Sequence, residues 1–176
     1  MADGTYERRG PREAELKRFQ RLLDERRAAS GAARPVRAVV AFGSNLEPRR
    51  ETIDRALALL AELPGTRLVK TSPVVETEPV DVPERYRHLK FLNGAALFET
   101  TLAPLDFSRR MHAIEEALGR VRTERNGPRT IDLDLIVFGE VVMNTPELIL
   151  PHPRARFRPF VTGPMAELGL TIPDKH

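Results

Sequence analysis

The stretch that decides the fold is RNGPRTIDLDLIVF, residues 125–138. From Thr130 to Phe138 the residues alternate in polarity, which is the period of two expected for a half-buried β-strand. This alternation predicts that one face carries Ile131, Leu133, Leu135 and Val137. The other face then carries Asp132 and Asp134, so two carboxylates point the same way from a strand that is otherwise core.

Two aspartates at this spacing need an explanation, because aspartate is disfavoured in strands and like charges roughly 6.6 Å apart repel. A pair of Mg²⁺ ions about 3.5–4 Å apart would bridge them and hold the oxygens of a phosphoryl group in line. Arg125 and Arg129 precede the pair, where their planar side chains can grip phosphate. A half-exposed strand with a solvated polar face is the alternative at this point.

The composition is that of a single globular domain, with 176 residues, 41% hydrophobic residues and 30% charged residues. No apolar run approaches the roughly 20 residues that span a bilayer, so no membrane segment is expected. The chain has no cysteine, and its N-terminus is charged rather than apolar. These features predict a cytoplasmic protein without disulfides.

The net charge of +3 comes from the N-terminus: residues 1–35 hold nine Arg or Lys against six Asp or Glu, and the remainder holds 19 of each. Aromatic residues make up only 6% of the chain, which argues against a nucleic-acid-binding face. The body instead has a local set of arginines: Arg120, Arg122, Arg125, Arg129, Arg154, Arg156 and Arg158. Such a set suits a compact polyanion such as a triphosphate at least as well as a polymer.

The order of the predicted elements is βαββαβ. Residues 1–35 form a charged extension, helical over 11–29 or partly disordered, and residues 36–176 form the folded domain. The elements predicted in that domain are a strand over 36–42 closed by a tight loop at 43–45, a helix over 48–63, a strand over 66–77, a long lid-like loop over 78–90, a strand over 91–100, a helix over 104–119, the strand over 130–138, a short strand over 141–143 and a helix over 159–169.

This order predicts an α+β fold of the ferredoxin-like type, an antiparallel sheet with both helices on one face. A short C-terminal hairpin and helix and the N-terminal helical extension are added to it. The opposite face of the sheet is then free for a site. In the strand over 91–100, Leu92, Ala96 and Phe98 share one face, and Phe91 and Asn93 lie on the other.

The segment 127–134, GPRTIDLD, resembles the signature of the 6-hydroxymethyl-7,8-dihydropterin pyrophosphokinases. Members of this family transfer a pyrophosphoryl group from ATP to a pterin alcohol in folate biosynthesis. Three other segments are similar to the family: GSNL at 43–46, FLN at 91–93, and LPHP at 150–153 leading to Arg158 and Phe160. The resemblance runs from about Val36 to about Leu170.

The resemblance implies roles for individual residues. Asp132 and Asp134 would hold two Mg²⁺ ions, and together with Arg120 and Arg129 would form the catalytic group. The residues implied for pterin binding are Thr77, Val80, Phe91, Asn93 and Phe160, with the two aromatic rings stacking on the pterin and Asn93 bonded to its edge. Those implied for ATP binding are His112, Glu115, Arg120, Arg129, Leu135, His152 and Arg158.

The chain departs from the family at two positions: His112 stands where the family often has Gln, and Asn126 where it can have a large aromatic residue. These departures concern lid closure and rate more than the identity of the substrate. A nucleotidyltransferase, releasing inorganic pyrophosphate instead of AMP, and a non-enzymatic ferredoxin-like binding module are the rival interpretations. The expected partners are small molecules, with no nucleic acid or membrane, and the expected state is a monomer, with a dimer left open.

Overall fold

The computed structural model describes residues 17–18, 21, 34–121 and 124–174, so nearly all of the predicted N-terminal extension lies outside the described residues. The strands are β1 (Val36–Ser44), β2 (Thr66–Thr71), β3 (Val75–Thr77), β4 (Phe91–Thr100), β5 (Asp132–Phe138), β6 (Met143–Asn144) and β7 (Ile149–Leu150). The helices are α2 (Arg49–Ala61), α3 (Pro104–Ala117) and α4 (Pro159–Glu167), with short 3₁₀ turns η1 (Glu84–Tyr86) and η2 (Ala155–Phe157).

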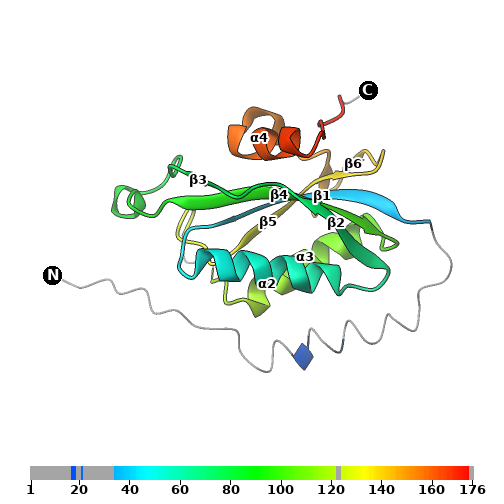
Figure 1. Ribbon diagram of the computed structural model, residues 1–176, viewed down its shortest axis with the longest axis horizontal. Coiled ribbons are helices and arrows are strands. Elements are labelled where there is room, and N and C mark those ends of the chain that lie inside the picture. The colour runs from blue at the N-terminus through cyan, green and yellow to red at the C-terminus, as the bar shows by residue number, and fades with distance from the viewer. Residues whose placement is uncertain (1–16, 19–20, 22–33, 122–123, 175–176) are drawn as a thin grey trace.

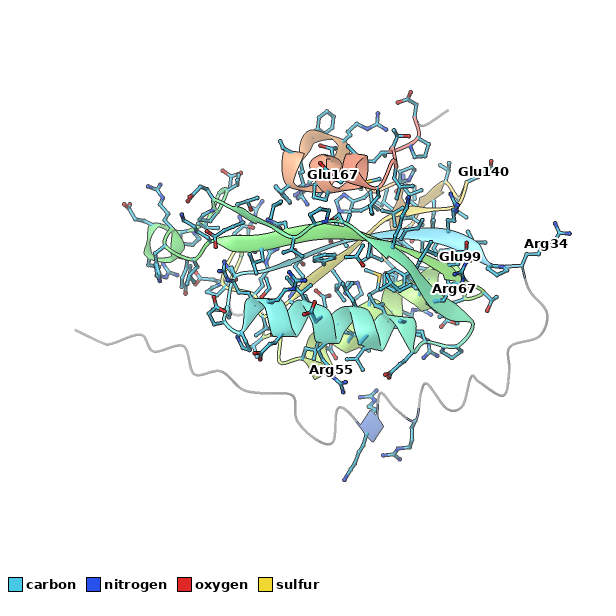
Figure 2. The ribbon with its side chains drawn as sticks, in the orientation of Figure 1. Arg34, Arg55, Arg67, Glu99, Glu140 and Glu167 are labelled. Carbon is cyan, nitrogen blue, oxygen red and sulfur yellow. The ribbon has the colours of Figure 1, made fainter. Side chains whose placement is uncertain are left out.

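The main sheet is antiparallel, with strand order β2-β4-β1-β5, and β3 also pairs with β4. Helices α2 and α3 cover one face of this sheet, and α4 lies over the other (Figure 1). With the side chains drawn, Arg55 of α2 and Glu167 of α4 lie on opposite sides of the sheet (Figure 2). The prediction of an α+β protein with an antiparallel sheet is confirmed.

The larger core lies between the sheet and the pair α2 and α3. The helical spacing of apolar residues in α2 and α3 buries one stripe of each, including Ile53 and Ile114. Phe107 of α3 packs between Phe98 of β4 and Phe138 of β5, with ring centroids 6.3 and 6.1 Å apart. This core fixes α3 against β5, the strand that carries both aspartates.

A second core lies on the opposite face of the sheet, beneath α4. It contains Val39, Ala41, Ala95, Leu97, Ile136, Ala155, Val161, Met165 and Leu168. The prediction that this face is free is therefore wrong in part, because the unbroken apolar run of β1 is buried on both sides. The uncovered part lies where β1 ends.

A β-bulge in β5 moves Val137 to a different face from the predicted one. Val39 of β1 pairs with Val137 while Val40 pairs with Leu135, so β5 has one extra residue between them. Val137 consequently packs on the core beneath α4, whereas Ile131, Leu133 and Leu135 lie in the larger core as predicted.

Three predicted element boundaries also change. The strand over 66–77 is interrupted at Pro73, which has no N–H to donate. Just before it, the Ser72 N–H donates a hydrogen bond to the Ala95 carbonyl and Ser72 Oγ accepts one from the Ala95 N–H, both at 2.9 Å. β1 continues through Gly43 and Ser44, and the predicted strand over 141–143 begins only at Met143.

Among the described residues, no helix is both long enough and apolar enough to span a membrane.

Candidate active site

The site forms where the ends of β1, β4 and β5 lie side by side. Gly43 of β1 pairs with Asn93 of β4 on one side and with Asp132 of β5 on the other. A Cβ atom on residue 43 would lie 2.7 Å from Asn93 Oδ1, so only glycine leaves room for this side chain. Asn93 Nδ2 donates a hydrogen bond to Thr77 Oγ1, which fixes the orientation of the amide.

The loop after β1 holds the arginine that precedes the aspartates. Asn45 Oδ1 accepts a hydrogen bond from the Arg129 backbone N–H at 2.7 Å, and the Asn45 N–H donates to the Arg129 carbonyl at 3.2 Å. Ser44 Oγ donates to the Thr130 carbonyl at 2.6 Å. No role was predicted for Ser44 and Asn45, although two polar residues that follow an apolar strand are a signal of buried hydrogen bonding.

Asp132 is compensated by two arginines. Its Oδ1 accepts a hydrogen bond from Arg120 Nη1 at 2.9 Å, and its Oδ2 accepts one from Arg129 Nη1 at 2.8 Å. The carboxylate is half-buried, with 22% of its side chain exposed, so these charge-assisted bonds are only partly screened by water.

The negative charge of Asp134 is compensated more weakly than that of Asp132. Among the described residues, its ion-pair partner is Arg158, whose Nη1 lies 3.9 Å from Asp134 Oδ2. Burial, and then the negative charge of Asp132, raise the pKa of Asp134 to about 6 against the favourable effect of the arginines. An added cation beside this carboxylate would lower its pKa again.

The donor set fits Mg²⁺ better than a metal that needs a complete protein cage. Among the residues that the structure describes, no three or more His, Cys, Asp or Glu side chains gather as a metal site. Mg²⁺ is commonly bound by one or two carboxylates, with substrate phosphates and water completing the octahedron. Asp132 and Asp134, next to several arginines, offer such a partial set.

Glu115 ties α3 to this strand. Its side chain is almost fully buried, and its Oε2 accepts hydrogen bonds from Arg120 Nη1 and from the Leu133 N–H at 3.2 Å. Its Oε1 lies 2.9 Å from Nδ1 of His112, which is half-exposed. A buried carboxylate with these partners holds the Arg120 guanidinium beside Asp132.

Two cavities meet at the aspartates. The first has a volume of about 460 Å³, and its walls include His112, Glu115, Arg120, Leu135, Glu147 and His152. The second has a volume of about 570 Å³, and its walls include Thr77, Val80, Phe91, Asn93, Phe157 and Phe160. Five residues line both cavities: Arg129, Asp132, Asp134, Arg154 and Arg158.

Every residue named for the site thus lines one or both cavities, the pterin set in the second and the ATP set in the first. One described member of the arginine set, Arg156, does not join them. Arg156 turns outward to Asp174, with Nη1 and Oδ1 3.2 Å apart, and Arg122 lies outside the described residues. Burial, Arg158 and Arg154 lower the pKa of His152, so this imidazole stays neutral at pH 7.

Two loops beside the second cavity are bonded to each other, and we call these contacts the interloop clasp. Glu124 pairs with Arg85 Nη2 and accepts a hydrogen bond from Tyr86 Oη at 2.7 Å. Asn126 Nδ2 donates to the Asp81 carbonyl at 2.8 Å. The clasp was not predicted, because its partners are far apart along the chain.

Comparisons with known proteins agree with this geometry. Residues 39–170 match the family model of 7,8-dihydro-6-hydroxymethylpterin-pyrophosphokinase. The chain is 45% identical over 140 residues to 2-amino-4-hydroxy-6-hydroxymethyldihydropteridine pyrophosphokinase of Pseudomonas aeruginosa, covering 78% of this chain and 85% of that protein. It is 39% identical over 131 residues to the protein of the same name from Bacillus subtilis, covering 74% and 77%.

A further relative is the folic acid synthesis protein fol1 of Schizosaccharomyces pombe, 36% identical over 132 residues, which cover 75% of this chain and 18% of that protein. The matched region contains both cavities, both aspartates and the helices α2, α3 and α4. The chain belongs to the 7,8-dihydro-6-hydroxymethylpterin-pyrophosphokinase family.

Proposed function

We propose that this chain transfers the pyrophosphoryl group of ATP to 6-hydroxymethyl-7,8-dihydropterin, releasing AMP, as a step of folate biosynthesis. One observation carries the proposal: a charged cavity and a partly aromatic cavity share Asp132, Asp134 and three arginines. Two substrates held in the two cavities would meet at this group. Family membership and the names of the relatives support the same reaction.

The second cavity suits a flat heterocycle. Phe91 comes from β4 and Phe160 from α4, so their rings approach the cavity from different elements and can stack on the two faces of a pterin. The Asn93 amide, held by Thr77, offers donors and acceptors to the polar edge of the ring. Val80 stands at the rim, where 63% of it is exposed.

The first cavity suits the triphosphate and adenosine of ATP. Arg120 and Arg129 donate hydrogen bonds to Asp132, and Arg158 forms a longer ion pair with Asp134. Phosphate oxygens can accept hydrogen bonds from the same guanidinium groups. His152, Leu135, Glu115 and His112 complete the ATP-binding set. Asp132 and Asp134 would hold two Mg²⁺ ions, which neutralise charge on the phosphates and orient their oxygens.

The reaction is then an in-line displacement. The hydroxymethyl oxygen of the pterin bonds to the β-phosphorus, the bond from that phosphorus to the α,β-bridging oxygen breaks, and AMP leaves with the electron pair while the hydroxyl proton is lost to solvent. The arginines stabilise the charge that develops, and positioning of the two substrates supplies much of the acceleration. No side chain is assigned as general base.

The finer features of the molecule complete the proposal. The strand order β2-β4-β1-β5, with α2 and α3 on one face, supports a ferredoxin-like arrangement. We assign catalysis to residues 36–176, acting as a monomer in the cytoplasm, and treat residues 1–35 as an appendage.

A direct test incubates the protein with ATP, Mg²⁺ and the hydroxymethyl-dihydropterin and follows AMP by chromatography. AMP should accumulate only when both the pterin and Mg²⁺ are present. Release of AMP at the same rate without the pterin, or no AMP with all three components, would contradict the proposal.

A further inference from the structure

Two exposed hydrophobic side chains line the second cavity. Phe157 is 77% exposed, the highest value among the described large hydrophobic residues, and Val80 is 63% exposed. A phenylalanine ring in water forgoes the free energy that its burial would release. Exposed apolar groups that border a cavity are a common sign of a ligand contact.

Hydrogen bonds hold the backbone of Phe157, so the position from which its exposed ring extends is well defined. Phe157 ends the turn η2, its N–H donates to the Arg154 carbonyl at 3.1 Å, and the Arg158 N–H donates to the Ala155 carbonyl at 3.1 Å. Ala155 is fully buried in the core beneath α4, which anchors the turn. Phe157 is followed by Arg158, whose guanidinium lies 5.8 Å from the centroid of the Phe160 ring.

The described residues of the arginine-rich loop bring little apolar cover to the second cavity. From the arginine-rich loop, the second cavity is lined by Arg125, Asn126 and Arg129, and the Asn126 amide is bonded to the Asp81 carbonyl. Besides Phe91 and Phe160, apolar cover over a ligand in this cavity can come from Phe157, from Val80 and from the neighbouring Val82.

The charge around the ring argues for a small anionic substrate complex rather than a second copy of the chain. Arg125, Arg129, Arg154 and Arg158 line the same cavity as Phe157, and two copies would bring these cations together. The cavity is also continuous with the two aspartates, where the reactive end of the pterin must lie under the proposed function.

We propose that Phe157 is a further pterin-binding residue, which with Val80 forms an apolar rim over the outer part of a pterin held between Phe91 and Phe160. The proposal rests on the proposed function of the site. Its role is to cover the substrate and slow its departure, so it acts on pterin affinity and leaves ATP affinity unchanged.

The test compares Phe157→Ala and Phe157→Tyr with Val142→Ala, a matched control because Val142 is 65% exposed and lines neither cavity. In steady-state assays of AMP formation, Phe157→Ala should raise the KM for the pterin about three- to tenfold, the range expected for a lost aromatic contact, with the KM for ATP unchanged. Phe157→Tyr should restore the parental KM. Val142→Ala should behave as the parent, and all Tm values should stay close together because both side chains are exposed.

A parental KM for the pterin in Phe157→Ala would overturn the proposal, as would an equal rise in the KM values of both substrates. An exposed ring could instead serve self-association, which sedimentation of the parent and of Phe157→Ala tests. Concentration-dependent dimerisation that Phe157→Ala abolishes would assign the ring to self-association and overturn the proposal. A parent that forms no AMP would instead refute the proposed function itself, so the two failures are distinguishable.

Discussion

The two aspartates on β5 have different surroundings. Asp132 has two arginine nitrogens within 2.9 Å, whereas Arg158, which pairs with Asp134 in the described part of the chain, keeps its nitrogen 3.9 Å away. Burial and the charge of Asp132 raise the pKa of Asp134 to about 6 from the ordinary value of 3.8. The folded protein therefore binds this proton more tightly than the unfolded chain does.

A pH dependence of stability follows, with its sign set by this raised pKa. The favourable contribution of protonated Asp134 is fully present below pH 3.8 and is lost as the pH rises through about 6. Asp134→Asn should thus gain Tm relative to the parent between pH 4 and pH 8 when both are measured in metal-free buffer. Asp54→Asn, on the exposed side of α2, serves as the control. A Tm difference for Asp134→Asn that does not change with pH would contradict this account.

Both aspartates should matter more for chemistry than for folding. Asp132→Asn and Asp134→Asn keep the size of the side chain but remove a charged oxygen ligand. We expect each variant to melt within a few degrees of the parent without Mg²⁺. Each should lose at least about a hundredfold in the rate of AMP formation, on the order of 2.7 kcal/mol of transition-state stabilisation. A destabilised variant whose folded fraction works normally would assign the motif to structure.

At the residue scale, the face on which a side chain lies could be predicted where the strand pairs regularly. It could not be predicted where pairing with the partner strand changes the register. The alternation around Asp132 and Asp134 held, because the first half of β5 pairs regularly with β1. The position of Val137 was wrong because the bulge depends on pairing with Val39, which the sequence of β5 does not encode. Arg156 was misplaced because its partner Asp174 belongs to a segment beyond the recognisable motifs.

Among the elements, the interloop clasp joins the loop after β3 to the loop before β5. Its centre is Glu124, whose pKa is lowered by the Tyr86 hydrogen bond and then by Arg85. Asp81 and Asn126, which form its other contact, are the two non-glycine residues with positive φ in the described part of the chain, at 54° and 56°. Two turns of this kind in contact suggest that the loops order together.

Glu124→Ala should therefore loosen both loops. Hydrogen exchange of residues 78–90 should become faster in the variant without ligands, and addition of ATP and the pterin should slow it in both variant and parent. Glu84→Ala is the matched control, because the Glu84 carboxylate pairs with Arg87 of the same loop, at 3.7 Å, and forms no ion pair with the described residues of the other loop. Equal exchange in the parent and in Glu124→Ala, or loops equally protected with and without ligands, would refute the clasp as a link between the loops.

The positions of helices and strands could be predicted where the local sequence marks their ends and their apolar period. α2 and α3 begin next to Pro48 and at Pro104 and keep a helical apolar period, so their positions were predicted closely. The hairpin of β6 and β7 was displaced because two-residue strands have no period to detect. The break between β2 and β3 follows from Pro73, although the sequence analysis did not use this signal.

In the whole molecule, the placement of α4 was the main feature that the sequence analysis did not predict. A helix over residues 159–169 was expected, but its apolar residues alone do not determine which face of the sheet the helix covers. The burial of β1 on both sides resolves the question, because Val39 and Ala41 need a partner opposite α2 and α3. Covering this face confines the site to the end of the sheet, where β1, β4 and β5 meet.

The N-terminal residues should be dispensable for catalysis. Within the part of the chain that the structure describes, both cavities and both cores are built from residues after position 35. Deleting residues 1–33 should leave AMP formation largely intact, measured at equal concentrations of folded protein. A truncated protein that keeps its Tm but loses most of its activity would show that this segment belongs to the site or to an interface that orders it.

The position of bond cleavage in ATP tests the central claim most directly. Parallel reactions with ATP labelled at the α- or the γ-phosphorus, with Mg²⁺ and the hydroxymethyl-dihydropterin, are separated by chromatography. The account predicts that the γ-label moves to the pterin product while the α-label is recovered in AMP. Recovery of the γ-label in free pyrophosphate with the α-label on the acceptor would identify a nucleotidyltransferase, and recovery of the α-label in ADP would identify transfer of a single phosphoryl group; either result would contradict the account.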